Sequence, residues 1–181
     1  MTPQDRDTLL HYINSDDVQE RRQAAIELGR MQDETILEAL LEAIHDTDAT
    51  VRANAASGLG LNQAEKAVTP LIDLLRDTDD LVRERAATAL AQIGDSRAIP
   101  ALIDAIDDSG TWARNRLIYV LGASKAAEAV EPLIVQLDHD DFSTQGVAAW
   151  ALGAIGDTRA LSPLRDLLKR NDASVRGNAA Y

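Results

Sequence analysis

The side chains able to do metal or acid–base chemistry are scattered through this 181-residue chain. Its three histidines, His11, His45 and His139, lie in well-separated segments, and there is no cysteine. A metal site needs several ligands that converge on one ion, and these histidines do not. No nucleophile elbow or dinucleotide motif occurs either. We therefore expect no catalytic residue, no metal and no cofactor; enzymatic activity stays undecided, and the sequence favours its absence.

The aromatic and arginine side chains point to a different chemistry, the binding of another protein. The chain has only two Trp, three Tyr and one Phe, and all but Tyr12 lie beyond residue 110. Trp, Tyr and Arg dominate the hot spots of protein interfaces. The predicted partner-binding surface consists of Trp112, Asn115, Arg116, Tyr119, Phe142, Trp150 and Tyr181.

The charge of the chain restricts the class of partner. Its formal net charge is −12, and its sequence pI is about 4.6. Nucleic-acid phosphates and anionic membrane surfaces both require clustered Lys and Arg, so we expect neither as a partner. An acidic surface favours a neutral or basic protein partner, or simply confers solubility. The N-terminal residues carry acids, and no apolar run is long enough to span a membrane, so we expect a cytoplasmic protein.

A repeat of 31 residues must position these side chains. One column holds an arginine in every slot but one: Arg21, Arg52, Arg83, Arg114, Gln145 and Arg176. Four residues earlier, a second column holds Asp17, Asp48, Asp79, Gly110, Asp141 and Asp172. Leucine columns follow the same spacing without an insertion. The repeat units span about residues 1–31, 32–62, 63–93, 94–124, 125–155 and 156–181, and the last unit is incomplete.

Each unit is predicted to form two antiparallel helices. In the second unit, apolar residues recur at three- and four-residue spacing over 34–45 and again over 49–61, and Asp48 is a good N-cap between them. Two such short helices cannot bury their apolar faces alone, but stacked pairs can. The sequence therefore predicts an all-α fold, a right-handed α-solenoid of about six two-helix repeats, as one domain over 1–181.

The charged columns predict a structural ladder along the stack. We expect each Asp to cap its helix and to pair with the Arg four residues later, or with the Arg of a neighbouring unit. The ladder residues are Asp17, Arg21, Asp48, Arg52, Asp79, Arg83, Arg114, Asp172 and Arg176. Gly110 and Gln145 interrupt the ladder in adjacent units. A place where a repeat loses the residues that its scaffold needs indicates a functional stretch.

One stretch of sequence carries a family resemblance. The string from Asp79 to Leu90, followed by Ile93-Gly94-Asp95, resembles the short HEAT-like repeats associated with phycobilisome lyases, and the match recurs over essentially the whole chain. The resemblance implies that the Val-Arg helix of each unit lines the concave side and that the proline-bearing helix lies outside. Deoxyhypusine hydroxylases are similar to this family and bind iron through His-Glu pairs; the chain has no His-Glu dipeptide, so that activity is rejected.

Two functions and one structural alternative remain open. The favoured function is a non-catalytic scaffold that binds a protein partner on the concave face of the Val-Arg helices. The alternative, implied by the resemblance, is a bilin lyase subunit or phycobilisome-associated factor, in which an open-chain tetrapyrrole or a phycobiliprotein meets the aromatic residues and Arg116 lies near the propionates. The structural alternative is that the aromatic rings only fill space between helices that Leu117, Ile118 and Val120 make bulkier.

Overall fold

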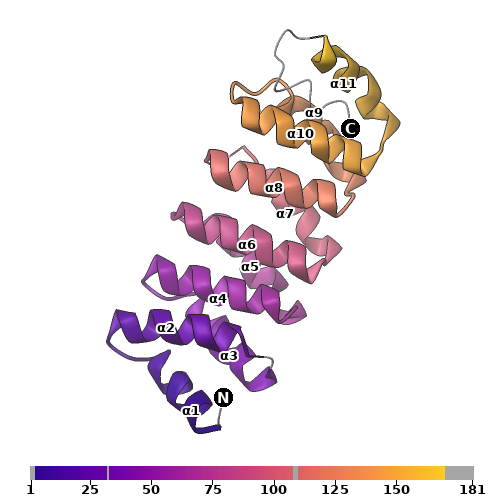
Figure 1. Ribbon diagram of the computed structural model, residues 1–181. Helices are drawn as coiled ribbons and strands as arrows, with labels where there is room; N and C mark the ends of the chain where they lie inside the picture. The colour runs from indigo at the N-terminus through magenta and orange to yellow at the C-terminus, as the bar shows by residue number, and fades with distance from the viewer. Residues whose placement is uncertain (1–2, 32, 108–109, 170–181) are drawn as a thin grey trace. The chain divides into compact units, whose positions relative to one another are not determined.

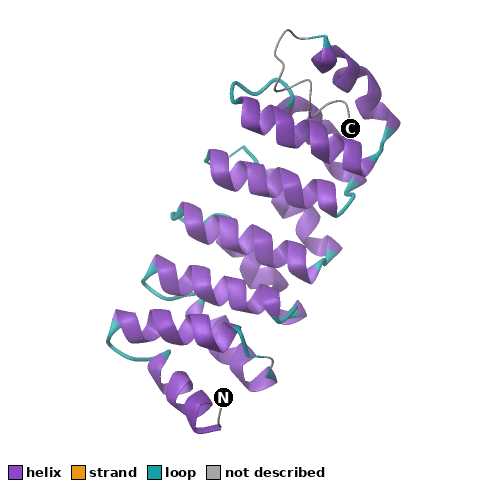
Figure 2. Ribbon diagram, in the orientation of Figure 1, coloured by secondary structure: helices purple, strands orange, loops and turns teal. Residues whose placement is uncertain are grey.

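The computed structural model describes residues 3–31, 33–107 and 110–169, and these residues form helices and the turns that join them, without a strand (Figures 1 and 2). Contacts within the chain divide it between Ala98 and Ile99 into two compact units, which are described separately. We call them the N-terminal unit and the C-terminal unit. None of the described helices is long and apolar enough to cross a membrane.

The N-terminal unit consists of helices in two layers. Its elements are α1 (Pro3–Tyr12), α2 (Val18–Gly29), α3 (Glu34–Ala43), α4 (Ala49–Leu61), the 3₁₀ turn η1 (Glu65–Ala67), α5 (Val68–Leu74), α6 (Asp80–Ile93) and η2 (Ser96–Ala98). Helices α2, α4 and α6 lie side by side in one layer, and α3 and α5 pack behind them (Figure 1).

The C-terminal unit repeats the same plan. Its elements are α7 (Ile99–Asp104), α8 (Thr111–Ala123), η3 (Ala127–Ala129), α9 (Val130–Gln136), α10 (Phe142–Ile155), η4 (Thr158–Ala160) and α11 (Leu161–Leu168). Helices α8 and α10 lie side by side, with α7 packed on α8 and α9 packed on α10 (Figure 1).

Local sequence signals set the helix boundaries as expected. The carboxylate of Asp48 accepts a hydrogen bond from the N–H of Val51 and begins α4, which spans the predicted residues 49–61. Gly94 and Gly156 end α6 and α10 in the left-handed conformation, with φ of 72° and 75°, which a residue with a side chain rarely adopts. The helix predicted over 34–45 ends at Ala43.

Small residues allow the helices of the front layer to approach closely. A Cβ atom added to Gly58 on α4 would lie 2.6 Å from the Cα atom of Gly29 on α2. Behind this contact, the side chains of Leu28, Leu40 and Leu59 are fully buried. Each unit is thus a short α-solenoid whose helix pairs bury one another's apolar faces, which confirms the predicted all-α solenoid class.

Candidate partner-binding surface

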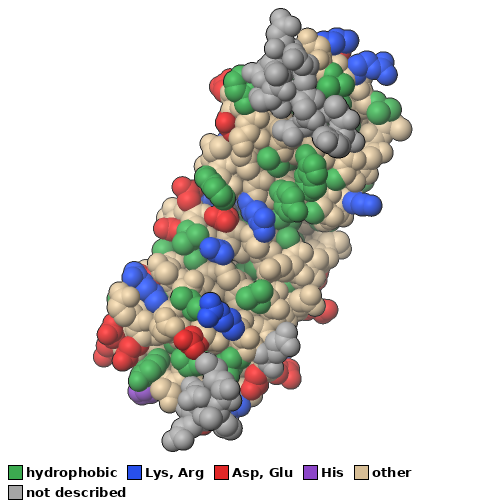
Figure 3. Space-filling model, viewed as in Figure 1, with side chains coloured by type: hydrophobic (Ala, Val, Ile, Leu, Met, Phe, Trp, Pro, Cys, Tyr) green, Lys and Arg blue, Asp and Glu red, His purple; other side chains and the backbone are tan. Residues whose placement is uncertain are grey.

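Helices α8 and α10 bring together the described residues of the predicted surface. Trp112, Arg116 and Tyr119 follow one another at four- and three-residue spacing, so they share one side of α8. Phe142 and Trp150 lie on the neighbouring α10. Tyr181 lies outside the described residues. Figure 3 shows hydrophobic side chains gathered on the viewed face over these two helices.

The four aromatic side chains keep much of their surface in water. Their exposed fractions are 79% for Trp112, 55% for Phe142, 45% for Tyr119 and 37% for Trp150. Large apolar side chains gathered this openly on one face mark an interaction site more often than a solvated surface. Most of the surface of Trp112 and more than half of that of Phe142 contact nothing within the chain, so these two rings do not fill space between helices.

Two of the rings stack on each other across the helix pair. The ring centroids of Tyr119 and Trp150 are 4.7 Å apart, and the ring planes differ by 7°. Gly122, one turn along α8 from Tyr119, permits this approach. A Cβ atom at Gly122 would lie 2.6 Å from the Cα atom of Ala151 and 3.1 Å from Cζ3 of Trp150. The stack is therefore held by a close helix crossing, and a partner would meet rings that are already ordered.

Arg116 places a positive charge against this stack. Its guanidinium carbon lies 5.5 Å from the centroid of the Tyr119 ring, within the range of a cation–π contact. Helix α8 carries Arg114 and Arg116 and no acidic residue, and α10 carries no charged residue at all. The helices that present the aromatic rings are therefore cationic, although the chain as a whole is strongly anionic.

Asn115 ties the two helices together. Its Nδ2 atom donates to Oγ of Ser143 over 3.0 Å, and its Oδ1 atom accepts from Oγ1 of Thr144 over 2.9 Å. Thr144 is fully buried. The sequence placed Asn115 on the binding surface; its contacts within the protein make it a residue that fixes α8 against α10.

A depression beside the stack includes residues that the sequence did not single out, among them Gly146 and Val147. Its volume is about 340 Å³, and Tyr119, Ser143, Gly146, Val147 and Trp150 line it. The signal for the two additions was present in the repeat. The columns of Gly146 and Val147 hold Asn115 and Arg116 one unit earlier. Because a small and an apolar residue replace two polar ones, this part of the depression is lined by apolar groups.

Aspartates of the ladder column cap helices in the part of the chain that the structure describes. Asp17, Asp48, Asp79 and Asp141 each accept hydrogen bonds from backbone N–H groups at the start of the following helix. Gly110 makes no side-chain cap for α8. Asp172 and Arg176 lie outside the described residues.

The arginine pairings differ from the predicted ones. Nε of Arg21 donates to Asp46 over 2.7 Å, and Nε of Arg52 donates to Asp77 over 2.8 Å, so each reaches an aspartate two residues before the next cap. A helical side chain leans toward the helix N-terminus, which directs each column arginine toward the aspartate two residues before the cap, while the cap Asp48 accepts from Arg22. Arg83 pairs with Asp80 on its own helix and donates to the backbone carbonyl of Asp77.

These contacts set the charge state of the aspartates. Burial, the largest single effect, raises the pKa of Asp46 and of Asp77. The hydrogen bonds from Arg21 and Arg52, those from the backbone N–H groups of Asp48 and Asp79, and the arginine charges together outweigh it, so both pKa values are lowered. Hydrogen bonds from Arg22, with a smaller opposing effect of burial, lower the pKa of Asp48 to about 2. All three side chains are therefore ionised at neutral pH, and their role is structural.

The C-terminal unit has a histidine and a glutamine where the N-terminal unit has these aspartates and arginines. Nη1 of Arg114 lies 3.0 Å from Nε2 of His139, which stands where Asp46 and Asp77 stand in the earlier repeats. Gln145 takes the arginine position and donates to the backbone carbonyl of His139 over 2.6 Å. Its Oε1 atom is buried and accepts no hydrogen bond.

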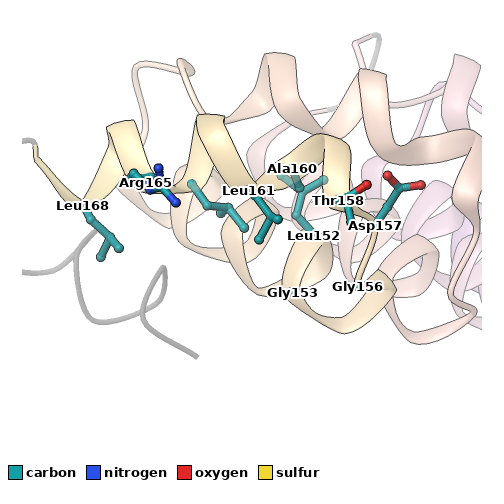
Figure 4. Close-up of a pocket in the computed structure, with 10 residues that line it drawn as sticks. Leu152, Gly153, Gly156, Asp157, Thr158, Ala160, Leu161, Arg165 and Leu168 are labelled. Atoms are coloured by element: carbon teal, nitrogen blue, oxygen red, sulfur yellow. The ribbon is translucent and has the colours of Figure 1, made fainter.

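A second depression lies between the end of α10 and α11. Its volume is about 440 Å³, and Leu161, Arg165 and Leu168 form one wall (Figure 4). Asp157 lies at its other end, where hydrogen bonds from Arg159 lower the pKa of its carboxyl group to about 2. This hollow holds no pair of side chains suited to acid–base chemistry, because its aspartate is ionised and engaged.

Comparison with known proteins supports the repeat assignment. The sequence model of HEAT repeats matches residues 6–61, 37–122 and 111–181. The structure of the complex of CpcE and CpcF of phycocyanin lyase from Nostoc sp. PCC7120 is similar, with 28% identity and a TM-score of 0.75 over 96% of this chain and 74% of that chain. No curated protein sequence matches the chain.

Two further structures share the fold. YibA of E. coli aligns with a TM-score of 0.76 and 22% identity over 93% of this chain and 66% of that chain. A designed armadillo repeat protein in complex with the peptide (KR)4 aligns with a TM-score of 0.64 and 21% identity over 95% of both chains. At these identities the likeness concerns the fold alone.

Proposed function

Since the chain belongs to the HEAT-repeat family, we propose that it is a non-catalytic scaffold that holds a protein partner on the exposed face of α8 and α10. One observation carries the proposal: Trp112, Phe142, Tyr119 and Trp150 expose 37–79% of their surface on two adjacent helices. The net charge of −12 supports a protein rather than a nucleic acid as the partner.

The chemistry of the surface suits a binding hot spot. Trp, Tyr and Arg contribute most to interfaces when they lie centrally and are desolvated by the partner. Tyr119 and Trp150 are ordered by their mutual stacking before any partner arrives, which reduces the entropy lost on binding. Truncation of one such ring costs about 2 kcal/mol or more of binding free energy at a hot spot.

Affinity capture with a matched variant tests the proposal. The wild-type chain and a Trp112→Ala/Tyr119→Ala/Trp150→Ala variant are immobilised, and circular dichroism establishes that both are folded. We expect a protein retained by the wild type and lost by the variant. A Leu61→Ala/Leu81→Ala variant, which removes exposed leucines of the N-terminal unit, should retain it. Equal recovery by all three proteins would refute the assignment of the partner to this surface.

A bilin lyase subunit or phycobilisome-associated factor is the second candidate. It is supported by the 28% identity with the structure of the CpcE–CpcF complex of phycocyanin lyase. The stacked rings and Arg116 would hold a planar tetrapyrrole through ring contacts and through its carboxylates. Titration with an open-chain tetrapyrrole should then change its red absorbance, and the Trp150→Ala variant should reduce the change. No spectral change with the wild-type protein would remove this candidate.

A further inference from the structure

The arrangement of the aromatic rings along α8 and α10 specifies more about the partner. We propose that this surface binds an uncharged, proline-rich segment of a protein in the polyproline II conformation. The inference deepens the proposed scaffold function and rests on it. The observation behind it is that the four exposed rings form two pairs, two helical turns apart, along the line where α8 and α10 meet.

The two helices run in the same direction and in one register. The side chain of Asn115 on α8 is bonded to Ser143 and Thr144 near the start of α10. Farther along, a Cβ atom at Gly122 would lie 2.6 Å from the Cα atom of Ala151. Because the pairing advances along both helices together, the first turns of α8 and α10 lie side by side.

This register sorts the rings into two pairs. Trp112 and Phe142 lie in the first turns and expose 79% and 55% of their surface. Tyr119 and Trp150 stack on each other farther along the same two helices. With a rise of about 1.5 Å per residue, the distance from Trp112 to Tyr119 along α8 is about 10.5 Å. A partner must therefore present two apolar groups at about this spacing.

A polyproline II helix presents apolar groups at nearly this spacing. It has three residues per turn and rises about 3.1 Å per residue, so residues i and i+3 point the same way about 9 Å apart. In an α-helix, residues i and i+7 share a face about 10.5 Å apart. In a β-strand, side chains of one face are about 6.6 Å or about 13 Å apart. The spacing therefore admits both kinds of helix and excludes the strand.

The polar atoms of the rings favour the polyproline II segment over the α-helix. Within the part of the chain that the structure describes, no hydrogen bond engages the indole N–H groups of Trp112 and Trp150 or the hydroxyl of Tyr119. An α-helix bonds its backbone carbonyl groups internally, whereas a polyproline II segment leaves its carbonyl groups free to accept. These rings can thus hold such a segment by apolar contact and by hydrogen bonds at once.

The segment must be uncharged where it lies on the surface. Helix α10 carries no charged residue, and α8 carries Arg114 and Arg116. Arg114 donates to the carbonyl group of Ile106 and contacts the ring of His139. Arg116 lies against the Tyr119 ring and is engaged within the protein. The two helices therefore offer a charged segment no free counter-charge, and of the neutral and basic partners that the sequence favoured, this face suits the neutral one.

The depression beside the stack suits a proline ring. Its volume is about 340 Å³, and Gly146 and Val147 line it together with Tyr119 and Trp150. A proline side chain loses almost no rotamer freedom when it is buried. Grooves lined by aromatic rings bind proline-rich segments in this way, because the segment is already ordered before it binds.

Two uncharged peptides of equal length test the inference. The first, acetylated and amidated, is Gly-Ser, eight prolines and Ser-Gly. The second has Leu-Ala-Ala-Gln-Ala-Ala-Gln-Leu in place of the prolines, which favours an α-helix with leucines seven residues apart. The chain contains only two tryptophans, so the indole N–H signals of Trp112 and Trp150 in a ¹⁵N spectrum report binding. We expect the proline peptide to bind about tenfold more tightly than the helical one.

Removal of one donor should weaken the binding of the proline peptide. Tyr119→Phe keeps the ring and removes the hydroxyl, so we expect about fivefold weaker binding from the loss of one hydrogen bond. Trp112→Phe removes an indole N–H and should act similarly, as read from the Trp150 signal. The control Tyr12→Phe removes the hydroxyl of an exposed tyrosine in the N-terminal unit and should bind as the wild type does. Dispersed spectra of each variant establish that it is folded.

The contrary outcomes are distinct from one another. Equal or tighter binding of the helical peptide at the same indole signals would refute the polyproline II partner and leave the surface as a binding site. Absence of binding by either peptide would refute the proline-rich segment, while affinity capture still decides the scaffold function. Wild-type affinity in both Tyr119→Phe and Trp112→Phe would overturn the hydrogen-bonded arrangement. Indole signals that move when the protein alone is diluted would show that a second copy covers the surface, which also refutes the proposal.

Discussion

In the N-terminal unit, Arg21 and Arg52 each reach an aspartate of the following repeat through two nitrogen–oxygen contacts of 3.1 Å or less. In the C-terminal unit, Arg114 of the same column contacts the ring of His139. The next slot of the column, 31 residues later, holds Gln145. The two units share their helix pairs, their glycine-mediated crossings and their aspartate caps. They differ in what joins one repeat to the next.

The difference coincides with a change on the exposed face. The column that holds Ile26, Ser57 and Thr88 in the N-terminal unit holds Tyr119 and Trp150 in the C-terminal unit. A repeat protein needs its scaffold contacts in every unit, but it needs a binding site in only one place. We infer that the residues of the N-terminal unit mainly serve regular stacking. In the C-terminal unit, ion pairs between repeats are absent at Arg114 and Gln145, beside the proposed binding surface.

Acid should produce the largest effect, because it acts on every aspartate pair at once. The folded pKa values of Asp46, Asp48 and Asp77 lie below the value of about 3.9 in an unfolded chain. Their contribution to stability is therefore complete above about pH 5 and is lost as the pH falls toward 2.

The two units should respond to acid at different pH values. Far-UV circular dichroism reports helices of both units, whereas tryptophan emission reports only the C-terminal unit, which contains Trp112 and Trp150. We expect the dichroism to fall at a higher pH than the emission changes, because the buried Arg–Asp pairs belong to the N-terminal unit. An emission change that precedes the loss of helix would contradict the comparison.

Removal of a single arginine should have the next largest effect. Arg52 and Asp77 expose only 14% and 9% of their side chains, and Arg52→Ala would leave the carboxylate buried without its cation. We expect the free energy of unfolding to fall by about 3 kcal/mol, at the lower end of the range for a broken buried pair. Urea unfolding measures it. The control Arg97→Ala, which breaks an exposed pair, should leave the midpoint unchanged, and equal midpoints for both variants would be contrary to the account.

Gly122→Ala should disturb a close helix crossing within the C-terminal unit, of a kind that the N-terminal unit also contains. The added methyl group would overlap Ala151, so we expect a loss of about 2 kcal/mol from overpacking. Gly60→Ala in the N-terminal unit meets Ala89 at 2.6 Å and should lose a similar amount. Only Gly122→Ala should also change the tryptophan emission, because Cζ3 of Trp150 lies 3.1 Å from the new atom. The same emission from both variants would show that Trp150 is not held by this crossing.

His139→Asp should make the C-terminal unit resemble the N-terminal one. Nδ1 of His139 accepts from the N–H of Asp141, as Oδ1 of Asp77 accepts from the N–H of Asp79, so an aspartate fits the position. Its charged hydrogen bond to Arg114 should raise the free energy of unfolding by about 1 kcal/mol at neutral pH. Urea unfolding with His11→Asp as the control checks this. A decrease in stability would mean that the histidine is the better partner for Arg114.

The repeat made much of the fold predictable from the sequence. The 31-residue period located the helix pairs, and Asp48 marked the beginning of a helix that the structure confirms. The partners of Arg21 and Arg52 were not predictable, because they depend on which way a long side chain leans between two turns that both contain aspartates. Several of the aromatic residues were predicted from their columns, but their stacking and the depression beside Val147 arise from the closeness of α8 and α10, which a period alone does not specify.

The most direct test compares two residues of one column. Trp112 in the C-terminal unit and Leu81 in the N-terminal unit both stand two residues before their column arginine, and they expose 79% and 40% of their surface. The affinity for the captured partner and the urea midpoint should be measured for Trp112→Ala and Leu81→Ala. We predict that Trp112→Ala weakens binding about tenfold or more while it changes the free energy of unfolding by less than about 0.5 kcal/mol, and that Leu81→Ala leaves binding intact. Wild-type affinity in Trp112→Ala, or a loss of stability in place of a loss of binding, would contradict the claim that α8 and α10 form the binding surface.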